Sequence, residues 1–408
     1  MNKDFHLYGT YTAAKLAGVD ENTARIVACA AQMVDDFTEK VTGDYAYATA
    51  RRLDKYIDLY RIYEDIKNAT KKGDKKEEQL ILENSLPWIL FHFIPGYLPS
   101  FNGDLSKLTQ REALLCGING DIQKALSKEI EKGENSEVVN NYVGLGITLH
   151  ILSDVYAHSG FSGLITDKPV IPKEILIYDA KKNEFKHFKS SLDILNSVKE
   201  LPKGIFYGHA KAEHLPDIST VEVKYCFNDE ETLIKDNKDL FAVAYSEIIC
   251  YVLKFMGKKA GEYDKVTNKW YKIINEYLIK KSKEKDGWWF DSNKYNYEYD
   301  TSFKDIQNLF YEAKVKGDSS KLKSEMGVDL EDLKDISDGM ISSKELDKVY
   351  EEYLKKISGD ERKQNKEYND FLNASKLIRC HELKFIKNIY TGEPINIQEL
   401  IHEDYGEK

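Results

Sequence analysis

Apolar residues recur at helical spacing along most of this chain. They predict one helix over Phe5–Ala17 and a second over Thr23–Asp36, with Asp20 as the N-cap of the second. Further helices are predicted over 109–132, 136–160, 240–256, 263–283, 302–316, 343–357 and 365–390. Short alternating stretches predict a hairpin within Pro169–Phe188 and a strand over Val221–Phe227. The pattern therefore predicts a mostly α fold, a multi-helix bundle with a small β-hairpin insertion and a helical C-terminal extension.

The composition agrees with this fold class. The chain has 408 residues, of which 42% are hydrophobic, and only 8 prolines, so it can bury a large core between long helices. This length suits one large domain or two ordinary ones. We expect a metal-binding helical domain over 1–260, with a β-containing insertion at about 165–230, and a helical C-terminal region over 261–408.

Charge and cysteine usage exclude several classes of protein. The net charge of -10 argues against coating of nucleic acid or attraction to an anionic membrane. The sequence has no apolar h-region at its start and no run of about 18 apolar residues, so we expect no membrane insertion. The cysteines lack CxxC spacing and are typical of free thiols in a reducing compartment: Cys29, Cys116, Cys226, Cys250 and Cys380. We expect a cytoplasmic protein.

The most informative stretch is Gly144–Phe161, where His150, Asp154 and His158 recur at every fourth position among apolar residues. On a helix they form one polar ladder on a face that otherwise reads as buried. At ~1.5 Å of rise per residue the two histidines lie roughly 12 Å apart, too far for one ion with ligands at ~2 Å. The ladder therefore suggests two or more neighbouring metals, with Asp154 between them. The alternative is a set of i,i+4 hydrogen bonds inside a core.

Two weaker signals precede the ladder. Asp35 and Asp36 end a nearly uncharged helix, where their charge opposes the helix dipole. Either carboxylate is a candidate ligand, and the alternative is the start of a solvated turn. His92 stands inside an apolar run, where a histidine is either a ligand or a satisfied core residue.

A second polar cluster follows the ladder. His209 and Glu213 have the i,i+4 spacing that lets an imidazole and a carboxylate share one ion on a helical face, and Pro216 then breaks the helix. His214 and Asp217 lie close by in the sequence. We count His214 as a further candidate ligand.

The order of these residues is similar to that of a known family. It runs His6, Asp35/Asp36, His92, His150-x3-Asp154, His158 and His209-x3-Glu213. This order resembles the zinc-dependent phospholipase C / S1–P1 nuclease superfamily over roughly the first 220 residues. The resemblance implies an all-helical enzyme with a three-zinc cluster that cleaves phosphodiesters and phosphomonoesters. The same segments are also similar to uncharacterised bacterial proteins without assigned activity.

The resemblance assigns ligands to each ion. The resemblance implies that a first zinc is bound by one of Asp35/Asp36 together with His92, His150 and Asp154. It implies that a second zinc is bound by His158, His209 and Glu213. It also implies that His6 and Asp154 form part of a third site. The family completes its third site with the α-amino group and side chain of an N-terminal Trp, whereas this chain starts with Met1. We therefore expect two zinc ions, with three as the alternative; carboxylate ligands also suit manganese or iron.

These features predict a metal-dependent phosphoesterase in which Asp154 contacts both ions. Asp217, or the spare member of Asp35/Asp36, would orient the attacking water or a ligand imidazole. We expect a small phosphoester such as a nucleotide as substrate, rather than a nucleic-acid polymer or a membrane. Arg51 and Arg52 are candidates for phosphate contact or part of a solvated helix face. The alternative function is a non-catalytic, metal-stabilised binding or assembly protein whose aromatic C-terminal region engages a protein partner.

Overall fold

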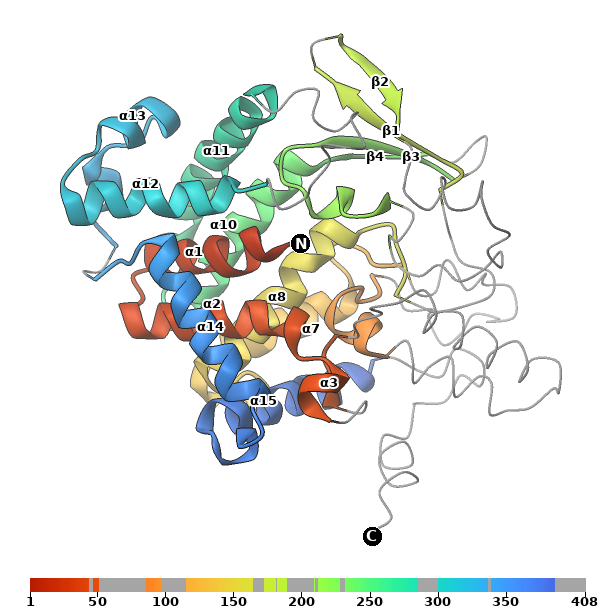
Figure 1. Cartoon of the computed structure of the whole chain (residues 1–408), viewed down its shortest axis with the longest axis vertical. Coiled ribbons are helices and arrows are strands. Elements are labelled where there is room, and N and C mark those ends of the chain that lie inside the picture. The colour runs from red at the N-terminus through yellow and green to blue at the C-terminus, as the bar shows by residue number, and fades with distance from the viewer. Residues whose placement is uncertain are drawn as a thin grey trace, which may run out of the picture.

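The computed structural model describes residues 1–43, 47–50, 86–96, 115–163, 172–180, 182–188, 209, 212–227, 232–284, 300–336 and 339–385. Over these residues the fold is mostly helical with one small sheet, which confirms the predicted fold class (Figure 1). The α-helices are α1 (Thr10–Leu16), α2 (Glu21–Asp36), α3 (Glu39–Thr42), α7 (Asp121–Glu131), α8 (Tyr142–His158), α10 (Asn237–Phe255), α11 (Ala260–Glu284), α12 (Ser302–Lys316), α13 (Ser320–Met326), α14 (Ser343–Ser358) and α15 (Lys366–Leu383). No helix in these ranges is long and apolar enough to span a membrane.

Helix α8 lies at the centre of the molecule and carries the predicted ladder. From Gly144 to His158 all of its residues are buried, which explains why its sequence is apolar on every side. It starts at Tyr142, later than predicted, because the Asn141 side chain accepts the Gly144 N–H at 2.9 Å and so caps the helix. The Ser136 hydroxyl instead organises a turn before the cap, since it accepts the N–H of Val139 at 2.8 Å.

Helix α2 crosses α8 at very close range. A Cβ atom at Gly146 would overlap the Val27 carbonyl oxygen and lie 2.8 Å from the Cβ of Ala30. Only glycine fits at this crossing, so the backbones of the two helices can approach each other. The close approach brings the C-terminal turn of α2, with Asp35, next to the middle of α8.

Helix α7 is shorter than the predicted helix over 109–132. It begins at Asp121, and residues 109–114 lie outside the described residues. Just before it, the backbones of Gly96 and Gly117 are so close that a Cβ atom at Gly96 would overlap Gly117. The chain at 115–120 is therefore packed against the segment that follows His92 and is not helical.

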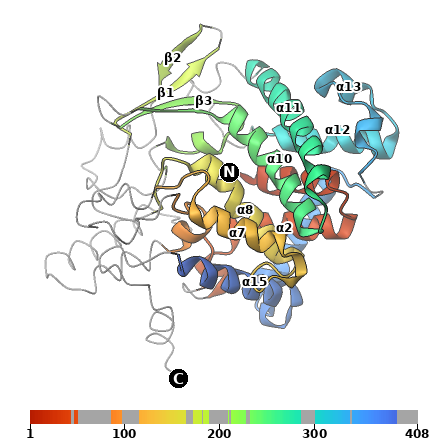
Figure 2. The same cartoon turned by 180° about the vertical axis from the view of Figure 1, so that it is seen from behind.

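The sheet has four antiparallel strands in the order β2-β1-β3-β4. The strands are β1 (Glu174–Asp179), β2 (Glu184–His187), β3 (Glu222–Cys226) and β4 (Thr232–Asp236). The first two form the predicted hairpin, and β4 was not predicted. Strand β4 ends at Asp236 and α10 begins at the next residue, so the sheet adjoins the start of α10 (Figure 2). The buried Lys235 of β4 donates to the carbonyls of Tyr156 and Ser159, at 3.0 and 3.2 Å, so the sheet lies against the end of α8.

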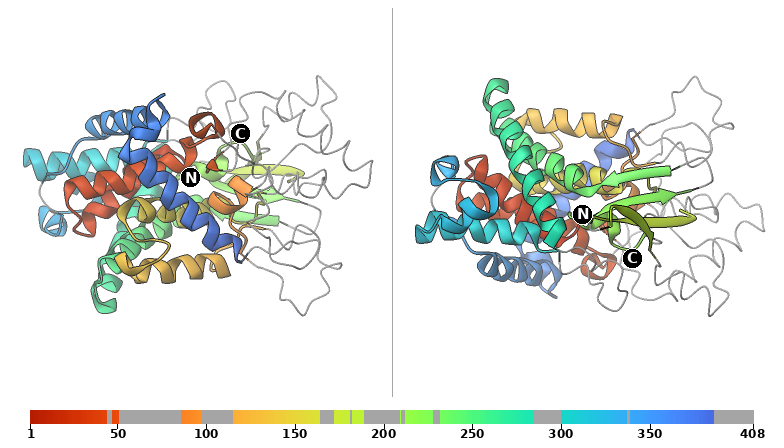
Figure 3. Two further views of the ribbon diagram at one scale, coloured as in Figure 1. Left: turned by 90° about the horizontal axis from the view of Figure 1, so that it is seen from below. Right: turned by 90° about the horizontal axis from the view of Figure 1, so that it is seen from above.

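The C-terminal helices pack onto the N-terminal ones, and one core runs from Met1 to Leu383. The ring of Phe303 on α12 meets that of Phe5 edge-on at 4.8 Å. The Tyr350 hydroxyl on α14 donates to Asp36 at the end of α2. Figure 3 shows these blue and cyan helices lying along the red N-terminal helices. The residues after 300 therefore support the segment that precedes α2.

Candidate metal centre

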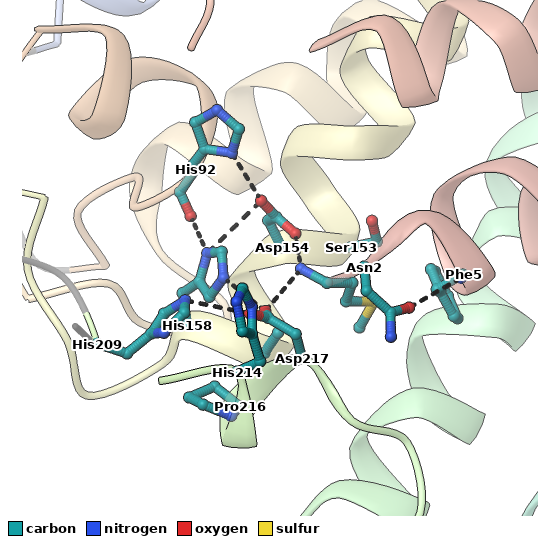
Figure 4. Close-up of polar contacts among 12 residues, drawn as sticks. Asn2, Phe5, His92, Ser153, Asp154, His158, His209, His214, Pro216 and Asp217 are labelled. Carbon is teal, nitrogen blue, oxygen red and sulfur yellow. Dashed lines mark hydrogen bonds and ion pairs between the residues drawn. The ribbon is translucent and has the colours of Figure 1, made fainter. Parts of the chain in front are cut away.

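Histidines and aspartates from distant parts of the chain meet beside α8 (Figure 4). The described residues include three groups in which the potential ligand atoms all lie within 4.8 Å of one another. These groups are His6, His150 and Asp154; Asp35, His92 and His150; and His158, His209 and Asp217. They could each hold a metal ion. The ladder on α8 contributes to all three, as its spacing suggested.

Four of these side chains form an inner group: Asp35, His92, His150 and Asp154. The Asp154 Oδ2 atom lies 3.1 Å from His92 Nδ1 and 3.2 Å from His150 Nε2, and those two nitrogens are 3.3 Å apart. The Asp35 Oδ1 atom lies 3.7 and 3.8 Å from the same nitrogens. Ligands at ~2.0–2.1 Å from a tetrahedral ion are about 3.3–3.4 Å from one another. The inner group is therefore close to the size of a tetrahedral zinc site.

Backbone carbonyls fix the proton on each inner imidazole. The Nδ1–H of His150 donates to the Ala31 carbonyl at 2.8 Å, and the Nε2–H of His92 donates to the Thr49 carbonyl at 3.2 Å. A carbonyl only accepts, so these nitrogens carry the hydrogen. When the ring is neutral, its other nitrogen presents a lone pair to Asp154. Since His150 has one such nitrogen left, the two groups above that include His150 could not each use it for a separate ion.

A second set, the outer group, comprises His158, His209 and Asp217. The His158 Nε2 atom lies 3.1 Å from Asp217 Oδ1, and His209 Nε2 lies 3.4 Å from Asp217 Oδ2. Again the opposite nitrogens donate to backbone carbonyls, from His158 to His92 at 2.7 Å and from His209 to Glu213. This arrangement of an imidazole with its far N–H tied to a carbonyl is usual for metal-ligating histidines.

The α-amino group of Met1 is buried beside both groups. It donates to Asp154 Oδ1 and lies 3.2 Å from Asp217 Oδ1. His6 is its neighbour: its ring stacks on His150 at 3.8 Å, and its Nε2 lies 3.1 Å from Asp154 Oδ1. The buried Nδ1 of His6 has no hydrogen-bond partner in the part of the chain that the structure describes. Met1 and His6 thus complete a third cluster of nitrogen atoms around Asp154.

The two oxygens of Asp154 therefore face different neighbours. Oδ2 faces the inner histidines, and Oδ1 faces Met1 and His6. Asp217 is divided in the same way, with Oδ1 toward Met1 and His158 and Oδ2 toward His209. Both aspartates are placed to bridge neighbouring cations.

One comparison with known proteins places this chain in a family. The model of a family of unknown function, DUF6765, matches residues 1–388. The chain belongs to the DUF6765 family. No curated protein and no solved structure matches it. The cluster of histidines and aspartates in this DUF6765 protein must therefore be interpreted from its own geometry.

Burial sets the protonation of the centre in this DUF6765 chain. It lowers the pKa of His6, His150 and His209 to about 4, so these imidazoles are neutral at physiological pH. Burial would raise the pKa of Asp154 and Asp217, but the Met1 ammonium and the histidines outweigh it and hold both well below the usual range. Neutral imidazole lone pairs thus face ionised carboxylates, an arrangement that a bound cation stabilises.

Burial and neighbouring charges also shift the pKa values of the Met1 amino group and of Asp35. Burial would lower the pKa of the Met1 amino group, but Asp154 and Asp217 reverse this and raise it to about 10. The ammonium is therefore an internal cation next to both carboxylates. The enclosed position of Asp35 raises its pKa to about 6, although 31% of its side chain is exposed.

The structure distinguishes Asp35 from Asp36, which the sequence offered as alternative ligands. Asp35 joins the inner group, whereas Asp36 accepts hydrogen bonds from Tyr350 and, at 3.2 Å, from Gln32. The sequence left open which of the two is a candidate ligand, and the structure favours Asp35, because successive side chains at the end of α2 point in different directions. His214 is on the rim, with 47% of its side chain exposed and its Nδ1 3.7 Å from Asp217 Oδ2. Arg51 and Arg52 lie outside the described residues.

The helix expected to carry His209 and Glu213 is replaced by a turn. Glu213 has a φ of 52°, and a 3-10 helix, Leu215–Asp217, follows it. Glu213 contributes its backbone carbonyl, which accepts from His209, and Asp217 supplies the carboxylate of the outer group. The sequence also argued against the α-amino group, because Met1 stands where the similar family has Trp, yet the structure places this group beside Asp154 and Asp217.

Proposed function

We propose that this protein is a metal-dependent hydrolase of phosphate esters. The observation that supports this proposal best is the set of imidazole lone pairs that face carboxylates. His92, His150, His158 and His209 each tie one N–H to a backbone carbonyl and direct the other nitrogen at Asp154 or Asp217. Nitrogen and carboxylate donors at these separations suit zinc, and also manganese or iron.

The donor sets fit more than one ion. Asp35, His92, His150 and Asp154 would hold an inner ion. His158, His209 and Asp217 would hold an outer ion. His6, together with the Met1 amino group once it has lost a proton, would supply donors beside Asp154 for a third. The buried Nδ1 of His6, which has no hydrogen-bond partner among the described residues, supports such a use. Neighbouring divalent ions supply Lewis acidity and an activated water for phosphate-ester hydrolysis.

The protein's own residues bind and orient in this proposal. Asp154 joins the inner group to the Met1 side, because each of its oxygens faces one of them. Ala31 and Thr49 orient His150 and His92 through their carbonyls, and Glu213 orients His209 in the same way. His214, half exposed on the rim, is the described histidine of the centre that is best placed to meet a substrate.

A small phosphoester is the substrate class that the charge favours. The net charge of -10 repels a long polyanion outside a local cleft, whereas a mononucleotide or sugar phosphate needs the ions and few further contacts. The resemblance to phospholipase C and S1–P1 nucleases supports phosphoester chemistry in general. We therefore propose hydrolysis of a small phosphomonoester or phosphodiester.

A structural metal protein is the second candidate, because two donors of the inner group are fully enclosed. His150 and Asp154 have side-chain exposures of 0% and 1%, which is typical of an ion that holds helices together. In this alternative the centre stabilises the fold, and the C-terminal helices bind a protein partner.

The decisive experiment compares turnover with metal content. Purified protein is analysed for transition metals, loaded to saturation, and assayed with nucleotides, single-stranded DNA and RNA, and lecithin vesicles. We expect about two equivalents of metal, or three if Met1 and His6 take part, and fastest turnover of the nucleotides. Saturated protein that cleaves none of these substrates would favour the structural alternative. Faster cleavage of polymer or vesicles would change the substrate class alone.

A further inference from the structure

The buried start of α12 contacts two other segments of the chain. Asp300 accepts the Ser219 N–H at 2.6 Å and the Ser219 hydroxyl at 3.1 Å. Asp4 accepts the N–H of Phe303 at 2.8 Å and that of Lys304 at 2.9 Å. The short stretch from Asp300 to Lys304 is therefore bonded on one side to the loop at Ser219 and on the other to the N-terminal segment.

Both segments deliver groups to the metal centre. Asp4 lies between Met1 and His6, whose nitrogens face Asp154. Ser219 follows the 3-10 turn that ends at Asp217, the carboxylate of the outer group. The start of α12 is thus a direct link between the two parts of the centre, although the inner group uses none of its residues.

The chemistry of the link favours a fixed geometry. The first N–H groups of a helix have no partner within the helix, so the Asp4 carboxylate satisfies them and is stabilised by the helix dipole. Asp4 and Asp300 are only 6% and 3% exposed, and a buried carboxylate that loses its donors is costly. The rings of Phe303 and Phe5 pack edge-on beside these bonds. The segment carrying Met1 and His6 therefore has little freedom to shift relative to α12.

We propose that Asp4 and Asp300 are positioning residues that set the separation between the Met1 and His6 nitrogens and Asp217. This inference extends the description of the metal centre and rests on the metal binding that we propose above. Met1 precedes a short π-helix, Asp4–Gly9, that carries His6, and Asp217 ends a short 3-10 turn, whereas the ladder residues are fixed by the long helix α8. The described residues after 300 thereby take part in building the centre, and none of them belongs to the three groups of potential ligands.

The competing explanation is that these bonds stabilise the fold and nothing more. Gln307 offers a matched control, because it lies one turn further along α12, is fully buried, and donates to the Ile341 carbonyl at 3.0 Å. Gln307→Met removes a buried hydrogen bond from the same helix without touching either segment of the centre. Asp4→Asn and Asp300→Asn keep the shape of the side chain and remove its charge, and Ser219→Ala is a milder change that retains the Ser219 N–H.

The first measurement is zinc affinity by competition with a chromophoric chelator, on the full-length chain. We expect Asp300→Asn, and to a smaller extent Ser219→Ala, to weaken the more weakly bound ion by about 10-fold or more, as loss of a ligand-orienting partner does. Gln307→Met should lower the melting temperature by a similar amount but change zinc affinity by less than about twofold.

The second measurement needs no metal. In chelator-treated protein, acylation of the Met1 α-amino group is followed by mass spectrometry of the N-terminal peptide. We expect Asp4→Asn to accelerate labelling by about tenfold, because the segment opens locally, and Gln307→Met to leave it within about twofold of wild type.

Variants of Asp4 and Asp300 that lose thermal stability like Gln307→Met, yet keep wild-type zinc affinity and wild-type labelling, would overturn the proposal. Neither readout depends on catalysis. Absence of phosphoesterase activity would therefore count against the proposed function and not against this one.

Discussion

The inner and outer groups of the centre have similar donors in different surroundings. Asp154 and His150 of the inner group have side-chain exposures of 1% and 0% and are carried by one long helix. In the outer group, His209 is 17% exposed, and its partner Asp217 comes from a short 3-10 turn. The rim residue His214 adjoins the outer group alone. The difference teaches that donors anchored on one long helix can adjoin donors held by short turns, although the inner group also includes Asp35, whose side chain is 31% exposed.

The largest expected effect is on Asp154, which serves both sides. Asp154→Asn should lower turnover of a nucleotide by more than the ~10–100-fold typical of a lost ligand-orienting partner. His6→Ala should cost less, because His6 Nε2 faces Asp154 Oδ1 and is not one of the inner-group donors. Both are measured as kcat/KM at saturating metal. Equal losses would mean that the Met1 and His6 side of the centre is as important as the inner group.

The second-largest expected effect tests whether the inner group contributes more than the outer group to the free energy of unfolding. His150→Ala removes a fully buried ligand and should destabilise the metal-loaded protein by on the order of 3–5 kcal/mol, because metal-binding free energy here is also folding free energy. His209→Ala, in the outer group, should cost about 1 kcal/mol while abolishing most turnover. Urea unfolding of both variants gives the numbers.

A surface histidine supplies the control for this pair. The side chain of His187 is 70% exposed, and its Nδ1 pairs with Glu174 at 2.7 Å. His187→Ala should change the free energy of unfolding by less than about 0.5 kcal/mol. If His209→Ala is as destabilising as His150→Ala, the proposed division between the groups is wrong.

Acid should destabilise the metal-free protein. The unfolded chain takes up protons at histidine near pH 6.5, whereas His6, His150 and His209 in the folded chain have pKa values of about 4. Stability that is present above pH 6.5 is therefore lost as the pH falls toward 4. Asp35 acts in the opposite direction between pH 6 and 3.8, because its pKa is raised to about 6 in the folded chain.

Three histidines outweigh one aspartate, so we expect a net loss on the order of a few kcal/mol between pH 7 and 5. Urea unfolding of chelator-treated protein at several pH values measures it. Saturating zinc at pH 7 should add stability that disappears on acidification, since protons compete for the same nitrogens. A stability that is constant from pH 7 to 5 would contradict the buried, neutral state of these imidazoles.

The smallest expected effect distinguishes the turn found at Glu213 from the helix that the sequence pattern predicted there. Glu213→Gln should leave metal content and turnover within about twofold of wild type, because His209 uses the backbone carbonyl of this residue. Asp217→Asn should remove the outer ion. If Glu213→Gln removes the outer ion and Asp217→Asn does not, then Glu213 is the ligand, as the spacing of His209 and Glu213 suggested.

The parts of the centre that were predictable are those encoded by local periodicity. The ladder on α8 follows from i,i+4 spacing in an apolar helix, and Asp35 from its place at the end of another. The boundaries of α12 were predicted as observed, since its apolar spacing is regular. Strand β4 and helix α13 were missed, because each is short and has few apolar residues to form a pattern.

The other parts depend on tertiary contacts. The same spacing that places His150 and Asp154 on one face fails for His209 and Glu213, because Pro216 and the positive φ of Glu213 make a turn there. The carbonyls that fix the imidazoles are backbone groups of Ala31 and Thr49, which no side-chain pattern can reveal. The position of the Met1 amino group likewise follows only from the packing of the N-terminal segment.

The contact between Asp4 and the start of α12 joins residues 299 positions apart, and that between Met1 and Asp154 spans 153 positions. Loops of this size are closed late in folding, because their entropy is lost before the contacts form. During synthesis, Asp4 is made long before Phe303, so its surroundings are complete only after most of the chain has been added. We expect the centre to mature after chain release, so that a nascent chain presents separate, weak ligands and acquires its ions only as a finished protein.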